Sequence, residues 1–280
     1  MLKGPNVGKI ILLNTPIGNL GDLTPRVLEA LQKGETFAVE DTRVFKDLLN
    51  HLGISLTGKQ IYSLHDQSED IQIKKLIDLA QGRTLYLASE AGSPIVSDPA
   101  YPLLKAAYEA GLEVDSYSGV SSPIMALELS GLPPIPFNFQ GFLPREALKK
   151  ATLWKELSYG THIFFEAPTR IEETLDQMSQ ENPELQVALV RELSKKFQQV
   201  ERFLARDWEE IKSKVMFKGE FVLVVYNPNA SSGQQHHQLK KLAEDILNQG
   251  ATPKNVAKLL GEILDRSSKD IYAQIVKPER

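Results

Sequence analysis

The strongest constraint on the fold of this chain is a regular alternation of short apolar, β-rich runs with amphipathic helical patterns. In the first half, strands are predicted at Lys9–Leu13, Thr36–Val39, Gln60–Ser63, Thr84–Ala88 and Glu113–Tyr117. Loops and amphipathic stretches separate these runs. The alternation predicts a parallel sheet with crossover helices, which is the α/β fold class.

The expected helices are bounded by residues that favour helix starts and stops. An oxygen-bearing side chain precedes a proline, whose missing N–H is not needed at the first helical position. These pairs are Thr24-Pro25, Asp98-Pro99 and Ser122-Pro123. A glycine suited to a left-handed helix end follows three of the stretches, at Gly53, Gly111 and Gly131. Helices are therefore expected where the crossovers of a parallel sheet require them.

The second half has a different pattern. Residues 132–136 are too rich in proline for a helix interior, so we place a domain connection near them. The elements predicted after it are helices at Glu146–Leu157 and Trp208–Lys214, and strands at Thr161–Phe165, Gln186–Val190, Gln199–Leu204 and Phe221–Tyr226. A polar linker, Asn227–Gln238, precedes a helix-turn-helix-like appendage, Leu239–Val276. We expect two α/β domains, residues 1–118 and 119–228, and a linker with a helical appendage, residues 229–280.

Composition excludes several kinds of chemistry. The 280 residues include no cysteine, which rules out a disulfide framework, a thiolate metal site and a thiol nucleophile. No signal peptide or membrane-length apolar run is visible, so a cytoplasmic protein is expected. The net charge of -4 argues against electrostatic coating of nucleic acid. Between Arg191 and Lys218, however, eight basic residues against five acidic ones are compatible with a local RNA-facing patch or with ordinary solvated faces.

Loops of small residues follow three of the predicted strands. They are Thr15–Asp22, Ser89–Pro99 and Ser118–Pro123. The first loop lacks both the glycine spacing of a dinucleotide site and the Gly-Lys-Ser/Thr of a phosphate loop, so neither ligand is predicted. Small residues let a ligand approach the main chain at the carboxyl ends of parallel strands. Three such loops at one sheet edge favour a shared pocket over three unrelated turns.

The second strand ends in the polar sequence Glu40-Asp41-Thr42-Arg43. Asp41 is predicted to be a helix N-cap, Glu40 a charge at the strand end, and Arg43 a fork for phosphate or carboxylate. The dipeptide His65-Asp66 is too common a pattern to indicate an acid–base dyad. The remaining histidines lack the spacing of a metal site, so no metal is predicted.

Seven motifs together resemble the tetrapyrrole-methylase superfamily of S-adenosylmethionine enzymes, and within it the ribosomal RNA small-subunit methyltransferase I branch. The motifs are Thr15–Asp22, Glu40–Arg43, Ser89–Pro94 with Ser97–Pro99, Gly141–Pro144, Phe165–Arg170, Arg191–Lys195 and Lys218–Glu220. They lie in order along nearly the whole chain, and the appendage looks like the C-terminal domain of that branch. The resemblance implies two α/β domains of the tetrapyrrole-methylase type, with the methyl donor in the cleft between them, usually in a homodimer. It also implies 2′-O-methylation of a cytidine in small-subunit (16S) ribosomal RNA.

Matching positions in the superfamily imply which residues bind S-adenosylmethionine. They are Pro16, Ala91, Gly92, Ser93, Val96, Ser121, Ser122 and Glu166. A ribose hydroxyl is a weak nucleophile, so a proton acceptor is expected. Glu40 and Asp41 are the candidates, with Arg43 as a phosphate contact. The chain departs from the usual family residues at Glu90, Ser93, Ser118–Val120 and Thr169. The first two changes keep the charge and the hydroxyl, whereas the other two bear on substrate positioning.

Two other functions are compatible with these patterns. One is a methyltransferase of the same fold that acts on a tetrapyrrole such as a precorrin or uroporphyrinogen. The other is a non-catalytic ribosome-assembly factor. The Glu40–Arg43 and Phe165–Arg170 motifs and the appendage favour the RNA branch, and the three intact donor loops favour an enzyme.

Overall fold

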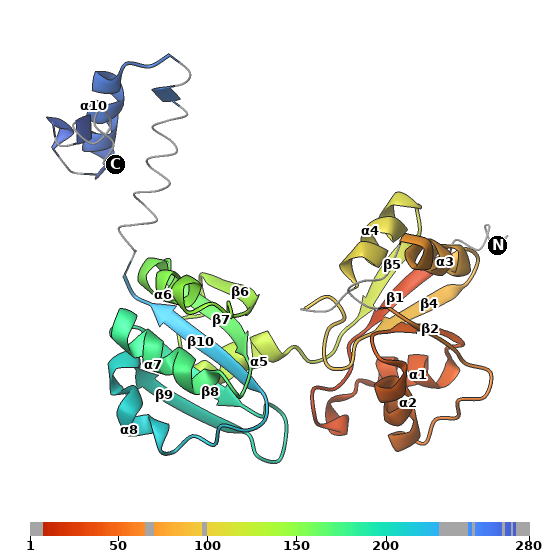
Figure 1. Ribbon diagram of the computed structural model, residues 1–280. Coiled ribbons are helices and arrows are strands. Elements are labelled where there is room, and N and C mark those ends of the chain that lie inside the picture. The colour runs from red at the N-terminus through yellow and green to blue at the C-terminus, as the bar shows by residue number, and fades with distance from the viewer. Residues whose placement is uncertain are drawn as a thin grey trace.

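The computed structural model describes residues 8–64, 70–96, 100–229, 246–247, 250–264, 267–269 and 271–272 (Figure 1). Two α/β units, each built on a five-stranded sheet, account for most of this part of the chain. The predicted α/β fold class is confirmed. The bounds predicted for the three units stay a prediction.

The first sheet is entirely parallel. Its strands are β1 (Lys9–Leu13), β2 (Thr36–Val39), β3 (Gln60–Ser63), β4 (Thr84–Ala88) and β5 (Glu113–Tyr117), in the order β3-β2-β4-β1-β5. All five strands agree with the ranges predicted from the sequence. Because every strand runs in the same direction, the loops that leave their carboxyl ends lie along one edge of the sheet.

Helices cover both faces of the first sheet. They are α1 (Pro25–Lys33), α2 (Thr42–His51), α3 (Asp70–Ala80) and α4 (Tyr101–Glu109), and the short 3-10 helix η1 is Leu20–Asp22. Side chains alternate across a strand, so Ile10 and Leu12 pack against α3 and α4, whereas Ile11 and Leu13 pack against α1 and α2. Burial on both faces explains why the central strands β1, β2 and β4 are nearly continuous apolar runs, whereas the edge strands β3 and β5 carry polar residues and are only partly buried.

The second sheet is mostly antiparallel. Its strands are β6 (Phe137–Phe142), β7 (Gly160–Glu166), β8 (Gln186–Arg191), β9 (Gln199–Leu204) and β10 (Phe221–Asn227), in the order β6-β7-β10-β8-β9. Only β6 and β7 pair in parallel. The strands predicted from the sequence agree to within one residue at each end, and β6 was not predicted.

Two layers of helices enclose the second sheet (Figure 1). The helices are α5 (Ser122–Ser130), α6 (Ala147–Glu156), α7 (Ile171–Glu181) and α8 (Trp208–Lys212), with the 3-10 helix η2 (Ala205–Asp207). Ala126 and Leu127 of α5 pack on one face, and residues of α6, α7 and α8 pack on the other. Since α5 belongs to this unit, residues 132–136 join α5 to β6 inside the unit. The domain connection predicted near them is wrong, because prolines after a helix mark its end whether or not a unit ends there.

Several predicted helix boundaries are confirmed. The Thr24 hydroxyl accepts a hydrogen bond from the Val27 amide, and Gly53, Gly111 and Gly131 have φ values of +68°, +70° and +68°. One boundary is corrected, because α5 begins at Ser122 and its N-cap is Ser121. The predicted cap Asp98-Pro99 lies outside the described residues.

The appendage contributes one described helix of full length, α10 (Pro253–Leu264), which begins after Thr252. Its buried residues Val256, Ala257 and Leu260 form a small cluster with Ile271 and with neighbours from the appendage itself. Most of the predicted linker, including His236-His237, lies outside the described residues. Among the described helices, none combines the length and the apolar character that crossing a membrane requires.

Candidate functional site

Three loops at the carboxyl edge of the first sheet come into direct contact. The loop after β1 and the loop after β4 are joined by two main-chain hydrogen bonds, from the Thr15 amide to the Gly92 carbonyl at 2.9 Å and from the Gly92 amide to the Thr15 carbonyl at 3.0 Å. The loop after β5 lies against the same place, because a Cβ built on Gly119 would be 3.0 Å from the Asn14 carbonyl oxygen. The structure thus brings together the three loops that the sequence placed at one edge.

Gly92 lies at the centre of this contact. Its φ of +79° is in the left-handed region, which favours glycine. A side chain here would also meet Ile17, whose Cγ2 atom lies 3.2 Å from the ideal Cβ position. The Ser89 hydroxyl donates a hydrogen bond of 3.0 Å to the Gly92 carbonyl and fixes the turn from β4. Backbone conformation and space therefore both select glycine at this position.

Main-chain donors remain available around this contact. Within the described part of the chain, the amides of Ser93, Val120 and Ser121 have no hydrogen-bond acceptor. Ser121 is the N-cap of α5, yet its side chain makes no capping hydrogen bond. Pro16 is buried, while Ser93 and Ser121 are partly exposed. Small side chains and unused amides suit a ligand that is recognised through its polar edges in a narrow slot.

The loop after β1 also packs against the second unit. Ile17 is 7% exposed and joins the cluster formed by α5 and the second sheet, with Ala126 and Ile163. Ser121 and Ser122, at the start of α5, come from this second unit. The predicted donor residues Pro16, Gly92, Ser93 and Ser121 therefore lie where the two units meet.

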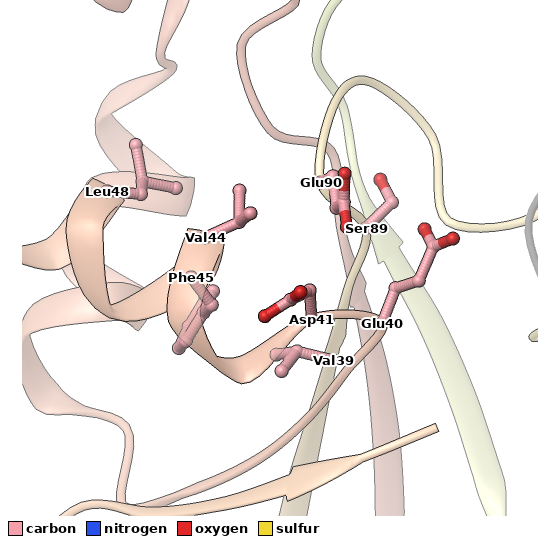
Figure 2. Close-up of a pocket in the computed structure, with 8 residues that line it drawn as sticks. All are labelled: Val39, Glu40, Asp41, Val44, Phe45, Leu48, Ser89 and Glu90. Atoms are coloured by element: carbon pink, nitrogen blue, oxygen red, sulfur yellow. The ribbon is translucent and has the colours of Figure 1, made fainter. Parts of the chain in front are cut away.

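Two of the three predicted catalytic residues, Glu40 and Asp41, line a separate, very small hollow, whereas Arg43 does not (Figure 2). Its walls are Val39, Glu40, Asp41, Val44, Phe45, Leu48, Ser89 and Glu90. The hollow has a volume of about 10 Å³, room for roughly one water molecule. It is not a ligand pocket. Glu40 and Asp41 point in different directions from the end of β2, with Asp41 directed toward the first turn of α2.

Asp41 is a helix cap, as predicted. Its carboxylate accepts a hydrogen bond of 2.7 Å from the Arg43 amide and forms an ion pair of 2.5 Å with the Arg43 guanidinium. These interactions hold the pKa of Asp41 far below its ordinary value of 3.8, chiefly through the Arg43 side chain. A carboxylate with so low a pKa is a very weak base, which makes Asp41 a poor proton acceptor. Glu40 is the better candidate of the two.

The Glu166 side chain is engaged in contacts with its own unit. The residue ends β7 with its side chain on the face covered by α6 and α7, opposite to α5. Glu166 is 2% exposed, and its carboxylate accepts hydrogen bonds from the Ala167 amide and the Thr174 hydroxyl. Arg170 forms an ion pair with it at 2.5 Å. The carboxylate is therefore committed to holding α7 against the sheet, and only the main chain of Glu166 is left to contact a ligand.

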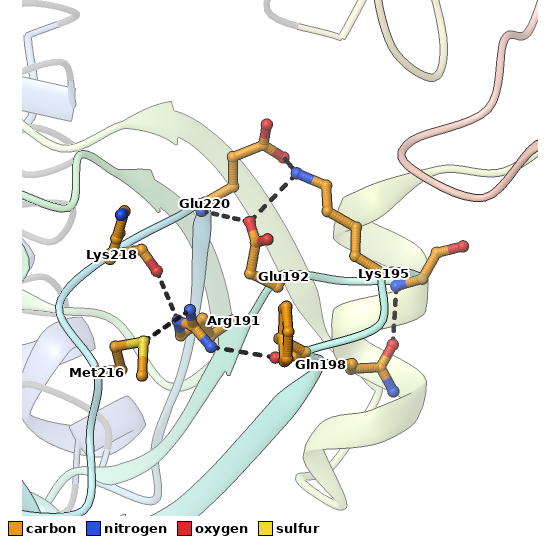
Figure 3. Close-up of polar contacts among 9 residues, drawn as sticks. Arg191, Glu192, Lys195, Gln198, Met216, Lys218 and Glu220 are labelled. Carbon is orange, nitrogen blue, oxygen red and sulfur yellow. Dashed lines mark hydrogen bonds and ion pairs between the residues drawn. The ribbon is translucent and has the colours of Figure 1, made fainter.

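A loop of the second unit also contacts the β1 loop; its Lys195 was predicted only as part of the basic segment between Arg191 and Lys218, and no role was predicted for Ser194. The Ser194 hydroxyl donates a hydrogen bond to the Asp22 carboxylate of η1, and the aliphatic part of Lys195 lies against Gly18. The Lys195 ammonium pairs with Glu192 at 3.2 Å and Glu220 at 3.0 Å (Figure 3). The β1 loop is therefore held by contacts with this loop as well as by its hydrogen bonds to Gly92.

Arg191 holds this loop in place through hydrogen bonds to main-chain carbonyls. Its side chain donates to the Lys218 carbonyl at 2.6 Å and to the Phe197 carbonyl at 3.1 Å, and it lies 3.5 Å from the Met216 sulfur (Figure 3). Glu192 and Ser194 have φ values of +52° and +64°, which are unusual for residues with side chains. Both motifs, Arg191–Lys195 and Lys218–Glu220, were identified in the sequence. Their contact through the Arg191 side chain is seen only in the folded chain.

The described residues contain no group of three or more His, Asp or Glu side chains placed to bind a metal ion. His65 and Asp66 lie outside the described residues.

Comparison with known proteins identifies relatives over nearly the whole chain. Residues 9–209 match the model of the family described as Tetrapyrrole (Corrin/Porphyrin) Methylases. The chain is 38% identical over 221 residues to the Ribosomal RNA small subunit methyltransferase I of Halalkalibacterium halodurans, covering 78% of this chain and 75% of the relative. It is 35% identical over 273 residues to the protein of the same name from Streptococcus pyogenes serotype M1, covering 95% and 94%.

A solved structure with a similar fold is uroporphyrin-III C-methyl transferase from Thermus thermophilus in complex with S-adenosyl homocysteine. It superposes with a TM-score of 0.52 at 17% sequence identity, covering 79% of this chain and 98% of that one. This identity is low enough that the likeness concerns the fold alone.

Proposed function

The chain belongs to the tetrapyrrole methylase family, in its ribosomal RNA small subunit methyltransferase I group, and we propose that it transfers a methyl group from S-adenosylmethionine to small-subunit ribosomal RNA. The finer proposal is that the acceptor is the 2′-hydroxyl of a cytidine ribose. The observation that carries the proposal is the contact of the three loops around Gly92, with unused amides beside it. A ribosomal substrate would place the reaction in the cytoplasm.

The donor would lie against the Gly92 contact. Pro16, Ala91 and Gly92 would form the walls of a narrow slot, while Ser93, Ser121 and Ser122 would offer main-chain and hydroxyl donors. Val96 lies on the same loop, whose turn is closed by a hydrogen bond from its amide to the Ser93 carbonyl. We do not assign the Glu166 carboxylate to the donor, since α7 already uses it. The residues present therefore fit a ligand recognised mainly through backbone contacts.

The bound donor would supply an electrophilic methyl group, so this chain mainly has to orient the acceptor hydroxyl and receive its proton. Orientation alone can contribute about 7–11 kcal/mol. Glu40, at the end of β2, is our candidate for the proton acceptor. Arg43 is 86% exposed at its side chain and could reach a phosphate while it remains paired with Asp41. In this proposal Asp41 positions Arg43 rather than accepting a proton.

The alternatives are less well supported. Relatives named for ribosomal RNA methylation cover 95% of this chain at 35% identity, whereas the similarity to a uroporphyrin enzyme is 17%. A non-catalytic assembly factor would not require a glycine in the left-handed conformation at the centre of three loops. Because the net charge is -4, we further propose that the assembled small subunit is methylated faster than protein-free RNA.

Ribose methylation has a direct chemical test. The full-length protein is incubated with S-adenosylmethionine and small subunits from a strain that lacks it, and the RNA is then hydrolysed with alkali. A methylated 2′-hydroxyl cannot attack the neighbouring phosphate, so one gap should appear in the cleavage ladder. Glu40→Gln should slow formation of the gap on the order of 100-fold and leave donor binding unchanged. An uninterrupted ladder with the wild-type protein would contradict the proposal.

We also propose that the protein forms a homodimer. The edge strand β6 supports this proposal, because one side of its main chain faces no other strand of the sheet. Phe142 on this strand is 61% exposed and Ile135 just before it is 83% exposed. Exposed apolar residues on a sheet edge favour pairing with a second copy. Sedimentation velocity of the wild-type protein and of Phe142→Lys would test it, with a single monomeric species for the wild type as the contrary result.

The appendage is proposed to increase the concentration of the enzyme on its substrate. Lys254, Lys258 and Lys269 are exposed and available to phosphates, whereas Lys240 and Lys241 lie outside the described residues. Truncation after Asn229 keeps β10 complete and should leave donor affinity unchanged, while methylation of the subunit falls through weaker substrate binding. Loss of donor affinity in the truncated protein would make the appendage part of the core.

A further inference from the structure

The second unit carries an exposed surface that combines lysines with apolar side chains. It consists of Lys196, Phe197, Lys214, Met216 and Lys218, which we call the Phe197 surface. Phe197 is 63% exposed and Met216 is 59% exposed. Large apolar side chains exposed side by side usually mark a contact with another molecule.

The two halves of this surface come from distant parts of the chain and are joined by hydrogen bonds of the buried residue Arg191. Arg191, 7% exposed, bonds to the carbonyls of Phe197 and Lys218 and contacts the sulfur of Met216 (Figure 3). The Gln199 side chain adds a hydrogen bond of 3.0 Å to the Lys214 carbonyl. The positions of the exposed residues are therefore fixed by the fold.

The charge of the surface is suited to an anion. In the described part of the chain, Lys196, Lys214 and Lys218 make no ion pair, whereas the neighbouring carboxylates Glu192 and Glu220 are both bound to Lys195. The Lys196 ammonium lies 5.5 Å from the centre of the Phe197 ring, so a cation and an aromatic face are presented together. This is notable in a chain whose net charge is -4.

The surface adjoins the proposed donor site. Phe197 follows Ser194 by three residues, at most roughly 11 Å of extended chain. Ser194 bonds to Asp22, and Lys195 lies against Gly18, both on the loop that carries Pro16. A molecule that lies on the Phe197 surface therefore extends naturally toward the donor loops.

We propose that the Phe197 surface binds a single-stranded segment of the RNA substrate, with a base stacked on Phe197 and phosphates held by Lys196, Lys214 and Lys218. This inference rests on the proposed function. Unpaired bases stack on exposed aromatic rings, while lysines follow the phosphates; this is how proteins hold single-stranded nucleic acid. A double helix would leave the ring of Phe197 without a partner, since its bases are already stacked.

The test uses the full-length protein and a fluorescein-labelled, unstructured RNA of roughly 10 nucleotides, a length within the range of single-strand sites. Phe197→Ala should weaken binding on the order of 10-fold, and Phe197→Trp should restore it. The double variant Lys196→Gln/Lys218→Gln should lower the slope of log K against log salt by about 0.7 for each lysine. Tyr108→Ala and Lys74→Gln, exposed residues of the first unit, are the matched controls and should bind like the wild type.

Donor affinity is measured by calorimetry in each variant and should not change. Wild-type RNA affinity in Phe197→Ala would overturn the inference, as would a change in sedimentation without a change in RNA affinity, which would assign the surface to contacts between copies. A wild-type protein that binds RNA through Phe197 but leaves no gap in the alkaline ladder would contradict the proposed reaction and not this surface.

Discussion

The first unit and the second unit build their parts of the site in opposite ways. Around Gly92 the contacts are made by main-chain atoms and small side chains, and the geometry depends on backbone conformation. Around Arg191 the contacts are made by long charged side chains that bond to carbonyls of separate loops. Substitutions that add side-chain atoms should therefore disturb the part of the site in the first unit most. Substitutions that remove a charged side chain should disturb the part in the second unit most.

This difference matches what each part is proposed to hold. A small donor needs a rigid, narrow slot, which a closely packed backbone provides at little cost in side-chain entropy. A long, charged RNA is bound by cationic side chains that extend from the protein surface to its phosphates.

The largest effect is expected for Gly92→Val. A β-branched residue at φ +79° is strained by about 1–3 kcal/mol, and its side chain would meet Ile17. Donor affinity should fall at least about 100-fold by calorimetry, with the protein still folded. The matched control is Gly58→Val, which has the same backbone strain at φ +80° but no atom within 4 Å. Equal loss in both variants would show that the effect is only backbone strain.

Arg191→Met removes a buried guanidinium and leaves the Lys218 and Phe197 carbonyls without their donor. Hydrogen bonds from a charged group are worth about 1.5–3 kcal/mol, so the free energy of unfolding in urea should fall by about 2–3 kcal/mol. Arg145→Met is the control, since Arg145 is exposed and makes no ion pair among the described residues. An unchanged unfolding midpoint would mean that the charged loops do not depend on Arg191.

A smaller effect is expected when the hydrogen bond between the Asp22 and Ser194 side chains is removed. This bond joins the β1 loop of the first unit to a loop of the second unit. Ser194→Ala should weaken donor binding about 5-fold, equivalent to about 1 kcal/mol. The exposed Ser213→Ala should have no effect. If the bond positions the β1 loop, Asp22→Asn should add little to Ser194→Ala in a double-mutant cycle. Fully additive losses would mean that the two residues act independently.

The smallest effect concerns pH. Burial raises the pKa of Glu192, but the Glu220 amide and Lys195 outweigh it and keep this pKa below the ordinary 4.5. Because the folded pKa is lower than the unfolded one, ionised Glu192 stabilises the protein above pH 4.5, and this contribution is lost as the pH falls through the folded pKa. Glu192→Gln should therefore be less stable than wild type by at most about 1 kcal/mol near neutral pH. Urea titrations that show a constant difference down to about pH 3 would contradict this assignment.

The sequence predicted the first sheet well because its central strands β1, β2 and β4 are mostly buried and therefore apolar on both faces. It did not predict β6 (Phe137–Phe142). This strand contains a glycine, and most of its residues are exposed. The register of β6 with β7 shifts between Phe139 and Phe142, beside Gly141 at φ +71°. An edge strand with an irregularity has neither the apolar run nor the clean alternation that marks a strand.

The candidate site was predictable only in part, for a related reason. Gly92 and Ser121 could be assigned to one site from the sequence, because both lie in loops that follow predicted parallel strands. Such loops lie at the same edge of the sheet. The contact between Asp22 and Ser194 joins residues 172 positions apart and depends on how the units meet. Glu166 was assigned from its motif, but the motif cannot tell which face of β7 its side chain occupies. Its partner Thr174 lies on α7, the helix that follows β7, and the two side chains meet only in the folded chain.

The pair of hydrogen bonds between Thr15 and Gly92 also bears on how freely this family can change its sequence. Both bonds join main-chain atoms, so their strength does not depend on the side chains at positions 90 and 93. Glutamate in place of the usual aspartate at Glu90, or serine in place of threonine at Ser93, therefore leaves the link intact. Side chains at the rim of the slot can therefore be exchanged without breaking the link between the two loops, whereas the φ of +79° restricts position 92 to glycine.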